Sequence, residues 1–69
     1  MSKAIKIKID KYAVFKRLDS MQMLRSELAK ELEVTEGAVL ARYAQGWRVS
    51  DALNLARILD CKVPEITEK

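Results

Sequence analysis

The 69-residue sequence contains no histidine, and its single cysteine is Cys61. One thiolate cannot supply the cysteine and histidine ligands that zinc uses, so the sequence predicts no metal site. The sequence also has no glycine-rich phosphate loop and no serine or cysteine nucleophile with an accompanying base. We therefore expect no cofactor, no small-molecule substrate and no enzymatic activity.

Long apolar runs are missing as well. No stretch approaches the roughly 20 apolar residues that cross a bilayer. The N-terminus alternates lysine with isoleucine, unlike the continuous apolar region of a signal peptide. An unpaired cysteine is typical of a reducing compartment. These features predict a cytoplasmic protein without a membrane partner.

The small size of the chain predicts a partner subunit. Apolar residues make up 49% and charged residues 33% of the sequence, as in a folded domain. A domain of this length buries only about 60% of its unfolded surface, so its stability is marginal. Without disulfides or a metal, the remaining sources of stability are tight helix packing and oligomerisation. We therefore expect a homodimer.

The N-terminal segment is basic and has the pattern of a β-strand. Residues 1–17 carry six basic residues and one acid, a net charge of +5, whereas residues 18–69 carry seven basic residues and nine acids, a net charge of −2. This imbalance indicates either a polyanionic partner or lysines that keep an edge strand soluble. Strict alternation over residues 4–10 places Ile5, Ile7 and Ile9 on one face of the predicted strand.

A single strand is unstable in water, and everything after residue 10 has a helical pattern. The strand must therefore pair with its copy in a second subunit or lie as an arm on the body. We divide the chain into a basic strand or arm, residues 1–10, and a helical domain, residues 11–69. Ile5, Ile7, Ile9 and Trp47 are the predicted dimer contacts, and burial of Trp47 in the core is the alternative for that residue.

The helical domain is expected to hold four or five short helices, which makes the fold all-α with one N-terminal strand. Asp10 is the expected N-cap of a helix over residues 11–20, and Tyr12 is assigned to the inner side of that helix. Further helices are expected over residues 25–33, from Thr35 to about Gly46, over 51–60 with Ser50 as N-cap, and over 64–67.

Residues 28–39 read L-A-K-E-L-E-V-T-E-G-A-V. Two short helices joined by so few residues cross steeply and need a small residue at their contact, which Ala29 supplies while Val34 fills the turn. This is the pattern of a helix-turn-helix, whose second helix fits the DNA major groove. Together with A-R-I-L-D-C-K-V-P-E-I at residues 56–66, the pattern resembles the phage repressor and Cro family of DNA-binding proteins, over residues 25–66. Glu33 stands where that family usually has glycine, so the backbone there either avoids a positive φ or is strained.

The resemblance implies that the outer face of the third helix contacts bases through Glu36, Gly37, Leu40 and Ala41. A glutamate can accept a hydrogen bond from cytosine N4, and Leu40 or Ala41 can touch thymine methyl groups. Gly37 offers no side chain, but it permits a close approach of the backbone.

Six residues around this helix are candidates for phosphate contact. Arg25 and Ser26 begin the second helix, where side chains and free N–H groups can meet phosphate, and Thr35, Arg42, Gln45 and Arg48 flank the third helix.

The sequence therefore predicts a transcription regulator that binds palindromic double-stranded DNA as a dimer, with two third helices about 34 Å apart. Apolar Leu40 and Ala41 on the exposed face favour the alternative, a protein-binding helix-turn-helix module such as an antirepressor or an assembly partner.

Overall fold

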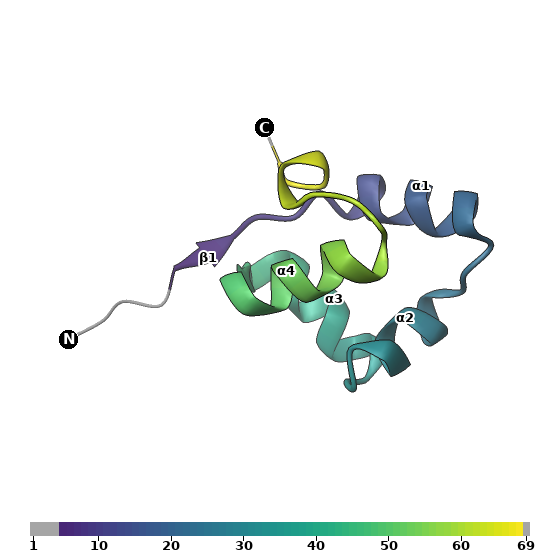
Figure 1. Cartoon of the computed structure of the whole chain (residues 1–69). Helices are drawn as coiled ribbons and strands as arrows, with labels where there is room; N and C mark the ends of the chain where they lie inside the picture. Colours follow the sequence, from purple (N-terminus) through teal and green to yellow (C-terminus); the bar gives the residue numbers. More distant parts are fainter. Residues whose placement is uncertain (1–4, 69) are drawn as a thin grey trace.

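The computed structural model describes residues 5–68. As predicted, the fold is all-α with an N-terminal β element (Figure 1). Its elements are β1 (Lys6–Ile7), α1 (Lys11–Met21), α2 (Arg25–Glu31), α3 (Glu36–Gln45), β2 (Trp47–Arg48), α4 (Val49–Ile58) and a 3₁₀ turn, η1 (Val63–Glu65). Within residues 5–68, every helix is too short or too polar to cross a membrane.

Two predicted helix caps are present. The Asp10 carboxylate accepts a hydrogen bond from the Tyr12 N–H at 3.0 Å, and the Thr35 hydroxyl accepts one from the Ala38 N–H at 3.1 Å. Each side chain satisfies one of the backbone donors that have no partner within the first turn of a helix. The predicted cap of the fourth helix is wrong, because α4 begins at Val49 and Ser50 already lies within it. The chain passes directly from extended Arg48 into the helix.

The expectation that β1 has no partner strand within the chain is also wrong. β1 pairs antiparallel with β2, with Lys6 opposite Arg48 and Ile7 opposite Trp47. Just beyond β1, the Glu68 N–H donates to the Lys8 carbonyl at 2.9 Å. The N-terminal strand is therefore held by β2 and by the C-terminal residues of the same molecule, without a second subunit.

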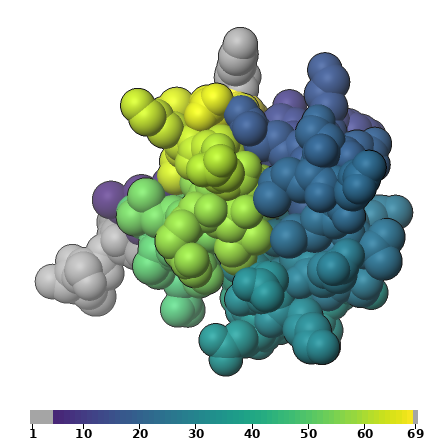
Figure 2. Space-filling view, turned by 45° about the vertical axis from the view of Figure 1, so that its right-hand side comes forward, coloured from purple at the N-terminus to yellow at the C-terminus, as the bar shows by residue number. Residues whose placement is uncertain are grey.

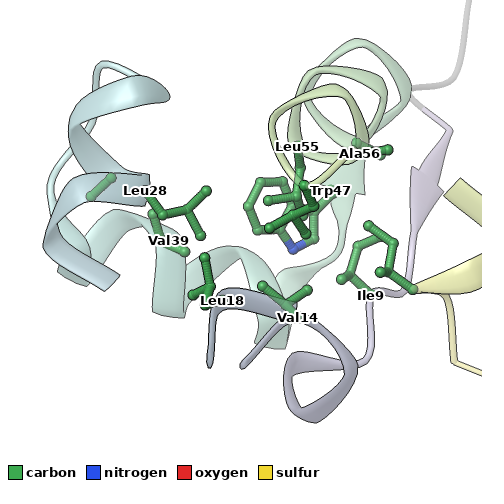
Figure 3. Packing of buried hydrophobic residues seen from close by; sticks show 12 residues of the cluster. Ile9, Val14, Leu18, Leu28, Val39, Trp47, Leu55 and Ala56 are labelled. Carbon is green, nitrogen blue, oxygen red and sulfur yellow. The ribbon is translucent and has the colours of Figure 1, made fainter. Parts of the chain in front are cut away.

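Trp47 lies at the centre of the core and is fully buried (Figure 3). Leu18, Leu28 and Val39 lie to one side of its ring, and Ile9, which is 1% exposed, lies to the other. In the space-filling view, α4 and the C-terminal residues, coloured green to yellow, pack directly against α1 and α2, coloured blue to teal (Figure 2). One continuous core thus joins the N-terminal strand to the helices.

This core corrects two of the predicted dimer contacts. Ile9 and Trp47 are enclosed by their own chain, so their side chains are not available to a second subunit. Ile7 is half-buried against the same core, whereas Ile5 is 70% exposed. The inward assignment of Tyr12 was wrong as well, since this ring is 71% exposed.

Candidate nucleic-acid interface

Residues 32–35 join α2 to α3 in a tight turn (Figure 1). The Val34 N–H donates to the Ala29 carbonyl at 3.0 Å, and Ala29 is buried where the two helices meet. Glu33 adopts a φ of 60°, which is costly for any residue with a Cβ. Of the two possibilities raised for this position, the structure therefore has the strained backbone.

The outer face of α3 is open to solvent. All four predicted base contacts, Glu36, Gly37, Leu40 and Ala41, are exposed, and helical spacing places them on one side of the helix. Ala44 is exposed on the same side and was missed from sequence, although it follows Leu40 by four residues. Three members of this outer face are glycine or alanine, so the α3 backbone can come close to whatever covers it.

Arg25 is held beside the start of α3 by an aromatic ring. Its guanidinium carbon lies 4.8 Å from the centroid of the Phe15 ring, in a cation–π contact. The Arg25 side chain is exposed and, with Glu36 and Leu40, lines a small hollow between α1, α2 and α3. The guanidinium is therefore partly ordered in advance of any contact with an anion.

Tyr43 forms the aromatic floor of the same hollow. Burial raises the pKa of Tyr43 to about 12, and the positive charge of Arg25 opposes part of this shift. The phenol is consequently neutral near pH 7, and its buried hydroxyl has no hydrogen-bond partner within residues 5–68. Such a group suits a packing role better than a nucleophilic one.

The start of α2 differs from the phosphate site that was expected there. Ser26 is exposed as predicted, but the Leu24 N–H donates to the Glu27 carboxylate at 2.9 Å. A negative carboxylate therefore occupies the end of the helix where a phosphate was expected to bind backbone N–H groups. Any phosphate contact from α2 depends mainly on the Arg25 side chain.

The predicted phosphate contacts at the far end of α3 do not all face outward. Arg42 is half-buried, with Nη1 3.8 Å from Asp51 Oδ2 and its guanidinium carbon 5.5 Å from the Trp47 ring centroid. Gln45 and Arg48 are exposed and line a cleft with Arg42. Lys6 of β1 also lines this cleft, and sequence reasoning missed it because it gave β1 no partner within the chain.

Comparisons with models of protein families, with curated protein sequences and with solved structures found no match for this chain. The assignment of a function therefore depends on the arrangement of its own residues.

Proposed function

We propose that this chain is a transcription regulator that binds double-stranded DNA by placing α3 in the major groove. The observation that carries the proposal is the outer face of α3, which is open, built mostly from small side chains, and bordered by Arg25 and Arg48. A major groove about 12 Å wide admits an α-helix, and small side chains let its axis approach the base edges. We propose neither a catalytic role nor a cofactor for the chain. Its proposed location is the cytoplasm, in association with the nucleoid.

The residues of this interface have different roles. Glu36 carries the only side chain on the outer face of α3 that can hydrogen-bond, so it is the candidate reader of a cytosine N4 amino group. Leu40 supplies an apolar contact suited to a thymine methyl group. Arg25, ordered by Phe15, contacts a backbone phosphate and fixes the position of the domain without reading sequence.

The proposal also includes a homodimer, with a contact surface that differs from the one expected. Ile5, Val49 and Leu53 are large apolar residues that remain exposed. Extending the β1–β2 register places Ile5 opposite Val49, and Leu53 follows Val49 by one helical turn. These three residues, in place of Ile9 and Trp47, form the proposed contact between subunits.

The test is binding to a random-sequence duplex at salt concentrations between about 50 and 200 mM. In a plot of log K against log salt concentration, where K is the association constant for the duplex, each phosphate contact makes the negative slope steeper by about 0.9. Arg25→Ala should reduce the steepness by about that amount. Lys16→Ala is the matched control, because it removes one exposed positive charge from α1 that lies outside the hollows lined by Arg25. Absence of duplex binding at about 50 mM salt would refute the proposal.

One observation favours the second candidate, a protein-binding module. Tyr12 and Leu40, which are 71% and 52% exposed, line one hollow between α1 and α3. Neighbouring exposed apolar side chains are more typical of a protein contact than of a phosphate backbone. Under this alternative the chain fails to bind duplex DNA at low salt, so the experiment above separates the two candidates.

A further inference from the structure

Side chains from four elements converge on one cleft at the C-terminal end of α3. The residues that line it are Lys6 from β1, Arg42 and Gln45 from α3, Gly46, Arg48 from β2 and Asp51 from α4. Three of these side chains are cationic and one is anionic, so the cleft carries a net charge of +2. We call this site the ribbon cleft.

The pairing of β1 with β2 brings the cations of the ribbon cleft together. Lys6 lies opposite Arg48 in the two-stranded sheet. Gly46 lets β1 approach the end of α3 closely, since a Cβ at that position would lie 2.9 Å from the Lys6 Cβ. The ribbon cleft is therefore a product of the fold, and Lys6 enters it from a segment 36 residues away from Arg42.

Two of the three cations of the ribbon cleft have no charged partner within the described chain. The Lys6 and Arg48 side chains make no ion pair or hydrogen bond with residues 5–68. Lys8, by contrast, is engaged, because its Nζ donates to the Ala44 carbonyl at 3.3 Å near the end of α3. Arg42 is only loosely paired, since 3.8 Å to Asp51 exceeds hydrogen-bond distance. Lys6 and Arg48 are thus available to an anion, and Arg42 can exchange its loose contact with Asp51 for a contact with the anion.

The dipoles of the flanking helices act in opposite directions. The negative end of α3 disfavours an anion, but Lys8 already meets one of its terminal carbonyl groups. The N-terminal end of α4 borders the ribbon cleft through Arg48 and Asp51 and has no side-chain cap, and its positive end attracts an anion, although Asp51 in its first turn offsets part of that attraction. Together with the net charge of +2, this arrangement suits a phosphate group.

We propose that the ribbon cleft binds a phosphate of the DNA backbone, which makes β1 part of the DNA interface. This inference rests on the proposed function, because a duplex that receives α3 in its major groove has a sugar–phosphate strand on each side of the helix. Lys6 and Arg48 contact that phosphate directly, and Arg42 moves from Asp51 toward it. The contact adds affinity for all sequences equally and reads no bases.

The test measures the salt dependence of duplex binding for the full chain and for Lys6→Gln, which keeps most of the side chain and removes its charge. Lys6→Gln should reduce the steepness of log K against log salt by about 0.9 and weaken binding to every sequence alike. Lys16→Gln is the control and should leave the salt dependence unchanged. Far-UV circular dichroism and thermal unfolding of both variants check that the fold is intact.

The outcomes separate this inference from the proposed function. If the wild-type chain does not bind duplex DNA, the proposed function fails. If it binds, and Arg25→Ala reduces the salt dependence while Lys6→Gln does not, the ribbon cleft is no phosphate site and the proposed function stands. A third outcome would assign the cleft to a free anion instead. In that case inorganic phosphate shifts the Gly46 and Arg48 amide resonances, while Lys6→Gln has no effect on duplex binding.

Asp51→Asn provides a second test that works in the opposite direction. This change removes the only negative charge of the ribbon cleft and frees Arg42, so duplex binding should tighten. The expected factor is roughly fivefold, which corresponds to the Coulomb energy of two unit charges about 4 Å apart in water. The same change removes an acid from the first turn of α4 and should slightly lower the melting temperature. Unchanged or weaker binding by Asp51→Asn would overturn the inference.

Discussion

Gly46 joins α3 to β2, and its replacement by alanine tests the close approach of β1 on which the ribbon cleft depends. Its φ of 93° lies outside the regions that residues with a Cβ adopt readily. An added Cβ would also lie 2.9 Å from the Lys6 Cβ and 3.7 Å from the Ile7 carbonyl oxygen.

The magnitude follows from these two effects. A residue with a Cβ in such a backbone conformation costs about 1–3 kcal/mol. Overpacking a close contact costs about another 1–3 kcal/mol. Alanine restricts the unfolded chain more than glycine, which returns about 0.4–1 kcal/mol. We therefore expect Gly46→Ala to lower the free energy of unfolding by about 1–5 kcal/mol, with a central value of about 3 kcal/mol.

Gly37→Ala is the matched control. Gly37 lies in the first turn of α3, and the nearest atom to an added Cβ is the Thr35 hydroxyl oxygen at 4.0 Å. Alanine is favoured over glycine in a helix by up to about 1 kcal/mol, so this variant should be slightly more stable than the wild type.

Urea denaturation followed by circular dichroism at 222 nm measures both variants. A small domain has an m-value of about 1 kcal/mol per molar urea, so Gly46→Ala should lower the midpoint by about 3 M or leave the chain unfolded. Gly37→Ala should move the midpoint slightly upward. If Gly46→Ala unfolds at the wild-type midpoint, the close approach of β1 to the end of α3 is incorrect.

Three further predictions concern the turn, the core and the proposed dimer. Glu33→Gly removes the cost of a φ of 60° and should stabilise the chain by up to about 1 kcal/mol in urea unfolding, whereas a loss of stability would contradict the strained turn. For Tyr43, the unfolded chain releases the phenolic proton near the ordinary value of 10.0, before the folded chain does at about 12. The wild type should therefore lose stability as the pH rises through this window, and Tyr43→Phe should lose less, while equal losses would argue against a buried phenol. Leu53→Asp should shift sedimentation from dimer to monomer without loss of helical circular dichroism, and an unchanged dimer would place the subunit contact elsewhere.

The helices were predictable because their signals are local. The Asp10 and Thr35 caps need only the two or three residues that follow them, and the exposure of Leu40 and Ala41 follows from helical spacing. The partner of β1 was not predictable in this way. β2 is two residues long, so it shows no alternation, and its pairing with Lys6 and Ile7 is a contact between distant parts of the chain.

The same limit explains the errors at the candidate site. Trp47 was assigned to either the core or a dimer contact, and the choice depends on contacts between distant parts of the chain, since helical side chains lie on one side of the ring and Ile9 lies on the other (Figure 3). Arg42 was expected to face outward, but Asp51 lies on the next helix and within its reach. Charge partners across elements have no fixed sequence spacing, so a basic residue beside a recognition helix cannot be assigned to phosphate from sequence alone.

The distribution of charge around α3 bears on what kind of DNA binding the proposal implies. Positive side chains stand at both ends of the helix, with Arg25 near its start and the ribbon cleft at its end, while the outer face between them offers one hydrogen-bonding side chain, Glu36. Affinity from phosphate contacts is independent of sequence and falls steeply with salt, whereas each good base contact contributes about 1–3 kcal/mol of discrimination. Under the proposal, a single monomer therefore has several side chains that can contact phosphate and few that can distinguish one DNA site from another. Selectivity then has two sources. A dimer doubles the base contact of Glu36, and DNA sequences whose groove shape admits α3 deeply, with the small residues Gly37 and Ala41 on its face, are favoured over others.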